Sequence, residues 1–397
     1  MKELLKKILF IFGYQLSSNF VISKLYKKNA FNTKYNKKVL IAYITKPFFE
    51  GINYSHTNSL ECLTAAEIFN NLGYRVDVID YNLTKKINYA QYDIIYGMGS
   101  ALERAFYYQG TNKQLRIFYA TGCNPIYSDV ATTLRAREFY LEHNIILMNS
   151  ARIVRKSQHA QILLSDAVIV LGNKNVLDTY TNIDPQRTDR YIKLNAFFYD
   201  TYNINLEKKD FSKAKKHFLW FGSGGLLHKG LDILIDIFSK REDIHLHICG
   251  NLSNEKGFFN YYKYELTNKK NIIYHGFIDI RSKQFKSIMD ICGFVIFPSV
   301  SEGGSPALLN TIANGGLIPI ITKLTGLDLS KYGWIIDKPK LKNFEMAIDM
   351  VLKLENDELK QKAINIKKHV RAYYSYNKYK KNLTNIITGI LKKNHLI

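Results

Sequence analysis

The segment 293–316 has the sequence GFVIFPSVSEGGSPALLNTIANGG, in which three patterns follow one another. The apolar run Gly293–Phe297 predicts a buried strand, and a loop containing Glu302 comes after it. Ser305 with proline behind it is typical of a helix start, and Gly315 with a second glycine is typical of a helix end. The segment therefore predicts a strand, a loop and a helix in succession, which is the repeating unit of a parallel α/β sheet.

The same succession recurs along most of the chain, in two series separated by the polar segment 199–216, which has no sustained apolar period. The first series of expected strands is Val39–Ile44, Arg75–Asp80, Asp93–Tyr96, Arg116–Ala120, Ala167–Leu171 and Ile192–Ala196. The second is Phe218–Phe221, His245–Cys249, Ile272–Tyr274, Gly293–Phe297, Ile318–Ile321 and Trp334–Ile336. Helical periodicity lies between many of them, as in Thr57–Leu72 and Val130–His143. The predicted fold class is therefore α/β, with two doubly wound, Rossmann-like domains and an interdomain cleft at the carboxyl ends of the strands, where ligands bind.

Length and composition agree with this organisation. The chain has 397 residues, and at about 150 residues per domain this suggests two domains. Hydrophobic residues make up 46% and charged residues 23%, which excludes a disordered or fibrous protein. The four cysteines lie far apart with no C-x-x-C pair, so neither a zinc site nor a disulfide framework is indicated. We expect a protein of the reducing cytoplasm.

The net charge of +22 is concentrated near the two ends of the sequence. Residues 1–38 contain nine lysines and one acid, and residues 360–397 contain ten Lys or Arg and no acid. A nucleic-acid-binding protein more often spreads positive charge over its folded domains, so we expect no nucleic-acid partner. An anionic membrane surface is the partner that basic ends suggest. A general coding bias toward Lys, Asn, Ile and Tyr would give the same excess.

The segment Met1–Leu16 is predicted to form an amphipathic helix. Its apolar run Ile8–Phe12 is too short to span a bilayer, which needs about 20 residues, and no cleavage site for a signal peptide follows. On a helical wheel the leucines and isoleucines share one half with Phe12, the lysines share the other, and only Phe10 breaks the pattern. Such a helix either lies in a membrane interface or packs on its own domain.

A glycine-rich loop, FGSGGLLHKG at residues 221–230, lies between an expected strand and the expected helix Leu231–Phe238. The NH groups of such a turn can form an anion site at a helix start, and Lys229 adds a positive charge there. The loop is not a P-loop, because Lys229 is followed by glycine, and not a dinucleotide fingerprint, because Leu227 replaces the third glycine. A purely structural tight turn is the alternative.

Glu302 is expected just ahead of a helix N-terminus, whose positive dipole keeps the carboxylate ionised. The NH groups of Gly304, Ser305 and Ala307 could receive phosphate oxygens there. A fixed anion beside a phosphate site suits a donor that loses a phosphate leaving group and becomes cationic. The alternative is that Glu302 only caps the helix.

The motif from Glu302 to Ile320 resembles the E-x7-E region of retaining GT-B glycosyltransferases of the family-4 type. Residues 221–232 resemble the donor diphosphate loop of that family, and the segments 165–170 and 194–196 resemble the end of its first domain. The resemblance implies that Lys229 binds the donor diphosphate and that Glu302 contacts the transferred sugar. The donor-binding residues that we expect are Gly222, Ser223, Gly224, Lys229, Gly250, Phe277, Glu302, Gly303, Gly304, Ser305 and Asn310.

The chain departs from the family pattern at two positions. Ser223 stands where the family often has an arginine, so one cation for the diphosphate is missing. Asn310 stands where the second glutamate of E-x7-E would hold the ribose hydroxyls, and its hydrogen bonds lack charge assistance. We expect altered nucleotide binding, with a non-catalytic site as the alternative.

Residues of the first domain are expected to face the acceptor. His56 and Asn58 follow its first strand, and Asn124 follows a later strand at the same rim. Arg135 and Arg137 lie on the next expected helix and could face an anionic acceptor. The alternatives are that His56 caps a helix and that the two arginines are simply solvated.

Metal-using sugar transferases commonly carry Asp-x-Asp, which this sequence lacks, so we expect no metal and no other cofactor. The domains implied are an extension at 1–37, an acceptor domain at 38–205, a donor domain at 206–375 and a segment at 376–397 whose helix, Tyr376–Lys393, crosses back to the first domain. The function implied is that of a cytoplasmic, retaining glycosyltransferase that uses a nucleotide-sugar donor and a glycan or lipid-linked acceptor. Bacterial polysaccharide or lipopolysaccharide assembly, at the inner face of the plasma membrane, is the expected setting. A nucleotide-sugar epimerase of the same fold and a non-catalytic binding protein are the alternatives.

Overall fold

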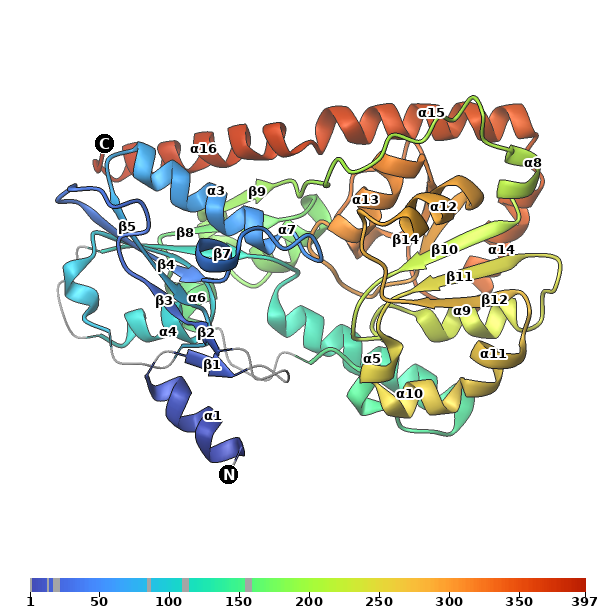
Figure 1. Ribbon diagram of the computed structural model, residues 1–397, viewed down its shortest axis with the longest axis horizontal. Helices are drawn as coiled ribbons and strands as arrows, with labels where there is room; N and C mark the ends of the chain where they lie inside the picture. The colour runs from blue at the N-terminus through green and yellow to red at the C-terminus, as the bar shows by residue number, and fades with distance from the viewer. Residues whose placement is uncertain (1, 13, 17–21, 84–86, 109–113, 154–158) are drawn as a thin grey trace.

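The computed structural model describes residues 2–12, 14–16, 22–83, 87–108, 114–153 and 159–397. They form two α/β domains joined by the linker 195–210, and each domain is built on one twisted sheet covered by helices (Figure 1). Each strand predicted from the sequence is present, with ends that differ by at most two residues. The predicted fold class is therefore confirmed.

The first domain has a seven-stranded sheet of order β3-β5-β4-β6-β7-β8-β9. Its strands are parallel except β3, which pairs antiparallel with β5 at the sheet edge and was not predicted. The strands are β3 (Tyr26–Lys27), β4 (Lys38–Tyr43), β5 (Arg75–Asp80), β6 (Ile94–Gly97), β7 (Leu115–Ala120), β8 (Ala167–Leu171) and β9 (Tyr191–Leu194). The helices are α2 (Pro47–Glu50), α3 (Asn58–Asn71), α4 (Gly99–Phe106), α5 (Pro125–His143), α6 (His159–Leu164) and α7 (Lys174–Thr181).

The second domain has a six-stranded parallel sheet of order β12-β11-β10-β13-β14-β15. Its strands are β10 (His217–Phe221), β11 (His245–Cys249), β12 (Ile272–Gly276), β13 (Phe294–Phe297), β14 (Ile318–Thr322) and β15 (Trp334–Ile336). The helices are α8 (Phe211–Ala214), α9 (Leu231–Phe238), α10 (Lys256–Tyr261), α11 (Lys263–Asn268), α12 (Lys283–Ile291), α13 (Pro306–Gly315), α14 (Leu341–Leu352), α15 (Asn356–Tyr373) and α16 (Tyr376–Lys393). Strands such as β8 and β13 are buried along their whole length, because helices cover both faces of a parallel sheet.

Two helices connect the domains in addition to the linker. Helix α5 leaves the first domain and runs beneath the second, and α16 runs back over the first domain beside α3 (Figure 1). The Tyr379 hydroxyl of α16 lies 3.0 Å from the Tyr119 hydroxyl of β7, and Lys380 forms a 2.8 Å ion pair with Glu67 of α3. The second domain's last helix therefore completes the core of the first domain.

The linker is held by a side chain of α13. The Asn314 Oδ1 accepts hydrogen bonds from the backbone N–H groups of Thr201 and Tyr202, at 3.0 and 2.8 Å. Its Nδ2 donates to the Tyr199 carbonyl at 3.0 Å. The sequence predicted no sustained helix or strand at 199–216, and the structure has the four-residue helix α8 in that segment. The backbone at 199–202 is nevertheless fixed, because Asn314 binds it.

The N-terminal helix is shorter than predicted. Helix α1 covers Lys2–Ile11, and the strand β1 (Tyr14–Leu16) pairs antiparallel with β2 (Ile22–Lys24). The prediction of a helix through Leu16 is therefore wrong, because strand pairing satisfies that backbone instead. Phe10, which breaks the amphipathic pattern, packs against the core of the first domain. Among the described residues, we find no helix with both the length and the apolar character needed to cross a membrane.

Candidate active site

A cavity of about 450 Å³ lies between the two domains, at the carboxyl ends of their strands. Loops after β4 and β7 line it from the first domain, and loops after β10, β11, β12 and β13 line it from the second. This is the place where a doubly wound sheet leaves room for a ligand.

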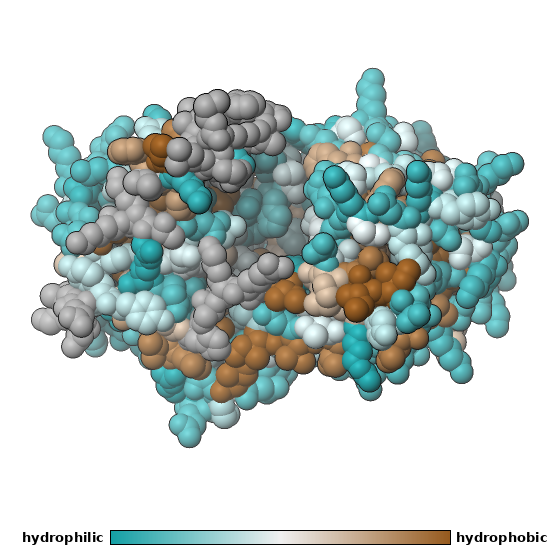
Figure 2. Space-filling model, turned by 90° about the horizontal axis from the view of Figure 1, so that it is seen from below, coloured by the Kyte–Doolittle hydropathy of each residue, from teal (hydrophilic) through white to brown (hydrophobic). Residues whose placement is uncertain are grey.

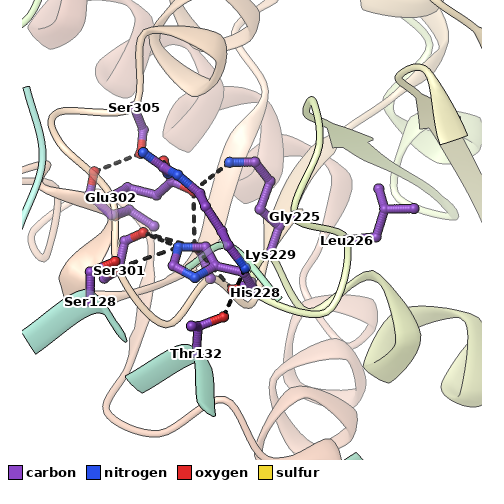
Figure 3. A network of polar contacts seen from close by, with 12 residues as sticks. Ser128, Thr132, Gly225, Leu226, His228, Lys229, Ser301, Glu302 and Ser305 are labelled. Atoms are coloured by element: carbon purple, nitrogen blue, oxygen red, sulfur yellow. Dashed lines mark hydrogen bonds and ion pairs between the residues drawn. The ribbon is translucent and has the colours of Figure 1, made fainter. Parts of the chain in front are cut away.

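Lys229 and Glu302 meet in this cavity, although 73 residues separate them in the sequence (Figure 3). The Lys229 Nζ lies 2.7 Å from Glu302 Oε1, and the Ser299 hydroxyl donates to the same oxygen at 3.1 Å. Both charged side chains are largely buried, at 7% and 12% exposed. The two motifs singled out in the sequence therefore form one site.

Glycine at two positions allows the loops to approach each other this closely. Gly230 has a φ of +65°, and a Cβ there would lie 2.5 Å from the Pro298 Cβ. A Cβ on Gly303 would lie 2.1 Å from the carbonyl oxygen of Thr121 in the first domain. The first glycine lets the Lys229 loop pack on the Glu302 loop, and the second lets the Glu302 loop close against the first domain.

Opposite charges keep Glu302 ionised. Burial alone would raise the pKa of this carboxyl, but the positive charges of Lys229 and Arg152 outweigh burial and lower the pKa to about 2. Burial also lowers the pKa of the Lys229 ammonium, and the negative charge of Glu302 opposes that shift. The site therefore holds a fixed carboxylate at any physiological pH.

His228 supports the Glu302 loop as a neutral side chain. Burial lowers its pKa to about 4, and its Nε2–H donates to the Ser301 carbonyl at 2.6 Å. The Ser301 hydroxyl lies 2.9 Å from the hydroxyl of Ser128 on α5 (Figure 3). The loop that carries Glu302 is therefore held from both domains.

The N-terminus of α13 opens into the cavity, which Ser305, Pro306 and Ala307 line. Ser305 occupies the N-cap position, as predicted, but in the left-handed region with a φ of 37°. Its hydroxyl donates to the Thr325 carbonyl at 2.6 Å and does not cap the helix. The first turn of α13 is thus left without a side-chain cap and faces the cavity, which suits an anionic ligand.

Most of the predicted donor-binding residues line this cavity, and one does not. Gly304 packs instead against the start of the linker, where a Cβ would lie 2.7 Å from the Ala196 Cβ. The predicted residues that line the cavity are Gly222, Ser223, Gly224, Lys229, Gly250, Phe277, Glu302, Gly303, Ser305 and Asn310.

Asn310 has a structural partner that the sequence did not reveal. Its Oδ1 accepts a 2.7 Å hydrogen bond from the Tyr199 backbone N–H, and the residue is 6% exposed. The side chain thus fixes the linker at the wall of the cavity, which limits the hydrogen bonds it can offer to a ribose.

Two backbone N–H groups of the glycine-rich loop bind a carboxylate side chain of the same domain. The backbone N–H groups of Gly225 and Leu226 donate to the Glu255 carboxylate, at 2.5 and 3.1 Å. The expected anion site at this turn therefore exists, but Glu255 fills it. The residues of this loop that line the cavity are Phe221, Gly222, Ser223, Gly224 and Lys229.

The first-domain predictions separate into two groups. His56 lines the cavity, and Asn58 lines an adjoining cavity of about 500 Å³. The His56 Nδ1 also accepts a 3.0 Å hydrogen bond from the Asn58 N–H at the start of α3, as a cap does. Asn124 and Arg135 are corrections, because both are buried away from this cavity. Asn124 is 0% exposed and caps α5 by accepting from the Ile126 N–H at 3.0 Å, and Arg135 is ion-paired with Asp232.

Sequence reasoning missed two charged residues of the cavity wall, Arg152 and Glu61. Arg152 Nη1 lies 3.3 Å from Glu302 Oε2, and Glu61 accepts a 2.8 Å hydrogen bond from the Tyr43 hydroxyl. Arg152 lies outside any predicted strand or helix, so no periodicity marked it. Glu61 lies within the predicted helix, among apolar residues that line its buried face.

Within the described part of the chain, no three His, Cys, Asp or Glu side chains gather as they would around a metal ion. Operation without a metal remains a prediction.

The comparisons with known proteins agree with this geometry. Residues 203–370 match the family model described as "Glycosyl transferases group 1". No curated protein sequence gives a significant match. Among solved structures, sucrose-phosphate synthase from Thermosynechococcus elongatus superposes with a TM-score of 0.63 at 10% identity, over 90% of this chain and 100% of that one.

Two further structures have the same architecture. HepE from Anabaena, in complex with UDP and glucose, gives a TM-score of 0.55 at 14% identity, over 89% of this chain and 100% of HepE. The lipopolysaccharide outer core galactosyltransferase WaaB gives 0.51 at 12% identity, over 89% of this chain and 99% of WaaB. At such identities the likeness establishes the fold. The chain therefore has the GT-B fold of two Rossmann-like domains, and its residues 203–370 match the family model of the group 1 glycosyltransferases.

Proposed function

We propose that this protein is a retaining glycosyltransferase that moves a sugar from a nucleotide diphosphate donor to a hydroxyl group of a glycan or lipid-linked acceptor. The observation that supports this most directly is the Lys229–Glu302 pair at the uncapped N-terminus of α13, inside the interdomain cavity. The positive groups suit the diphosphate, and the ionised carboxylate suits the positive charge that develops at the anomeric carbon.

The proposed mechanism is a front-face displacement. The bond between the anomeric carbon and the phosphate oxygen breaks, and the acceptor oxygen bonds to the same face of that carbon. The acceptor proton passes to the departing phosphate oxygen. Lys229 stabilises the charge on the departing diphosphate, and Glu302 stabilises the cationic sugar. This scheme uses residues of the chain and requires no metal ion.

We propose that the acceptor enters through the adjoining cavity of about 500 Å³, which shares Tyr54, Ser55 and His56 with the donor cavity. Its wall carries both signs of charge, from Lys46, Glu50, Asp80 and Arg281, and many polar groups. Such a wall suits a ligand rich in hydroxyl groups, such as a glycan.

We further propose that the protein works at the cytoplasmic face of an anionic membrane. Ile8 of α1 and Phe12, the residue directly after α1, are exposed at 43% and 67%, and the same segment contains Lys6 and Lys7. Apolar side chains also gather on the lower face of the molecule, where α5 lies (Figure 2). Exposed apolar residues of α5 and the loop after it include Ile126, Val130, Leu134, Leu141, Ile145 and Ile146. WaaB, which has the same fold, is a lipopolysaccharide outer core galactosyltransferase, and by this likeness we propose that the protein acts in the assembly of a bacterial polysaccharide or lipopolysaccharide.

Flotation with phosphatidylglycerol-containing vesicles tests the membrane proposal. Wild type should float with anionic vesicles and remain behind with neutral ones, and Phe12→Ser should reduce flotation. The matched control is Met346→Ser, which removes an exposed apolar side chain from α14 of the second domain and should float as wild type does. If wild type does not float, or if Phe12→Ser floats equally well, this part of the proposal is wrong.

A panel of nucleoside diphosphates and nucleotide sugars, screened by melting temperature, tests the enzymatic proposal. At least one donor should stabilise the protein, and NMR of a productive reaction should show that the anomeric configuration is retained. Conversion of the donor to an epimer without acceptor would instead favour an epimerase. Stabilisation without any turnover, across a panel of acceptors, would favour a binding protein.

A further inference from the structure

We infer that Arg152, a residue of the first domain, supplies the second cation for the donor diphosphate. This inference rests on the proposed function, and it assigns a role to a side chain that no sequence motif marks.

The charge balance of the cavity is the first observation. Among the described residues, the Asp, Glu, Lys and Arg side chains that line the cavity are Glu61, Arg152, Lys229 and Glu302. Lys229 forms a 2.7 Å ion pair with Glu302, which offsets part of the positive charge that Lys229 presents to a diphosphate. A diphosphate carries at least two negative charges, and Arg152 is the second Lys or Arg side chain, among the described residues, that lines this cavity and can help Lys229 to balance them.

The position of Arg152 is the second observation. A Cβ on Gly225 would lie 3.0 Å from the Arg152 Cβ and 3.6 Å from its Cδ, so the arginine stem lies over the glycine-rich loop. Its guanidinium reaches past that loop to Glu302 Oε2, at 3.3 Å. The head group thus lies between the loop and the carboxylate, where the departing phosphate is expected.

The exposure of Arg152 distinguishes it from Lys229. Its side chain is 45% exposed, whereas that of Lys229 is 7% exposed. The backbone of Arg152 is nevertheless anchored, because its N–H donates to the Thr132 hydroxyl of α5 at 3.1 Å. A fixed backbone with an accessible guanidinium allows the head group to turn from Glu302 toward a phosphate and to bind it with two parallel hydrogen bonds.

This arrangement divides the diphosphate site between the domains. Lys229 and α13 belong to the second domain, and Arg152 belongs to the first, so the leaving group bridges them. Donor affinity should then depend on the approach of the two domains, and loss of the diphosphate should loosen that approach.

Calorimetric titration of the full chain tests the assignment. The ligands are UDP, GDP, ADP and CDP, together with the matching nucleosides, on wild type and on Arg152→Ala. We expect the tightest nucleoside diphosphate to bind the variant roughly 10-fold to 100-fold more weakly, and the matching nucleoside to bind equally well. Arg152→Lys should bind the diphosphate with intermediate affinity, because a lysine makes no bidentate contact.

Ser223 provides a rescue experiment, because it is an uncharged residue of the glycine-rich loop in the same cavity. The double variant Arg152→Ala with Ser223→Arg should regain part of the diphosphate affinity. Arg137→Ala, which removes an exposed arginine from α5, is the matched control and should bind as wild type does. Unliganded melting temperatures verify that each variant is folded.

The possible results separate the two proposals. If Arg152→Ala binds the diphosphate as tightly as wild type, or loses diphosphate and nucleoside affinity equally, the role of Arg152 is refuted and the proposed function stands. If wild type binds none of the four diphosphates or their sugar conjugates, the proposed function is refuted, and this assignment with it.

Discussion

Arg135 of α5 and Asp232 of α9 form an ion pair between the two domains, with side chains that are only 2% and 0% exposed. Eight residues after Arg135, α5 makes a second link to α9, in which His143 Nε2 lies 3.0 Å from Asp236 Oδ2. The helix thus fastens the second domain to the first on the side opposite α16 (Figure 1). Each charged group of the pair is tolerated inside the protein because its partner is present.

Removal of one member of this pair should therefore be costly. We expect Arg135→Met to lower the free energy of unfolding by about 3–5 kcal/mol, because the Asp232 carboxylate is left buried without its partner. Arg135→Met with Asp232→Leu should recover most of that loss. Urea denaturation measures both, and equal stability of the single variant and wild type would contradict the importance of the pair.

Glu302→Gln should separate catalysis from binding. We expect kcat to fall about 10²-fold to 10³-fold, because the neutral amide no longer stabilises positive charge on the sugar. Diphosphate affinity should rise, because Lys229 and Arg152 lose their competing partner. Steady-state kinetics and calorimetry measure the two effects. Parallel losses of kcat and affinity would show that Glu302 serves the fold and not the reaction.

The pH dependence of the reaction should not come from Glu302. Its pKa of about 2 leaves the carboxylate ionised from pH 5 to pH 8. The same shift, from an ordinary value near 4.5, contributes stability above about pH 4.5 that is lost as the pH falls toward 2. Any fall of kcat between pH 8 and pH 5 should therefore persist with the same midpoint in Glu302→Asp.

A row of histidines on the second sheet should make folding sensitive to acid. His247 Nε2 lies 2.9 Å from His217 Nδ1, and His247 Nδ1 lies 2.9 Å from His275 Nε2. Each neutral ring supplies one donor and one acceptor, so the row is satisfied when none is protonated. Burial lowers the pKa of His217 to about 4 and that of His247 to about 3.

Because these folded-state values lie below the ordinary value of 6.5, the unfolded chain binds more protons in acid. Stability should be fully present above about pH 6.5 and should fall as the pH drops toward 4 and then 3. The melting temperature of His247→Phe should depend less on pH over this range than that of wild type. Identical pH profiles would show that the row does not titrate as the geometry implies.

Asn310→Glu should test the departure from the E-x7-E pattern. The new carboxylate can still accept from the Tyr199 N–H and offers a second, charged oxygen to a ribose diol. We expect the nucleoside to bind more tightly by a few-fold and pyrophosphate to bind as before. A loss of stability without any gain in nucleoside affinity would show that Asn310 serves the linker alone.

The sequence predicted the fold almost completely and the site in part. The strands were predictable because each is a short apolar run in a sheet that is buried on both faces. Lys229 and Glu302 were predictable because both follow strands whose carboxyl ends meet. Arg152 was not, because its place depends on how a loop of one domain meets the other, and no local pattern encodes that contact.

The two corrected residues show the same limit. Arg135 was expected at the acceptor, yet its partner Asp232 lies 97 residues away on another domain. Asn124 was assigned to the rim of the cleft, but the proline that follows it makes it the cap of α5. The sequence shows the residue types, and the packing between domains determines which of them face the ligand.

The crossing of α16 has a consequence for how the protein is made. Tyr379 contributes to the core of the domain that begins near β3, yet about 350 residues of synthesis lie between them. During translation the first domain leaves the ribosome before α16 is made, so the side of α3 that packs against α16 is uncovered until α16 emerges. The first domain should therefore complete its packing only after the second domain and α16 have been synthesised.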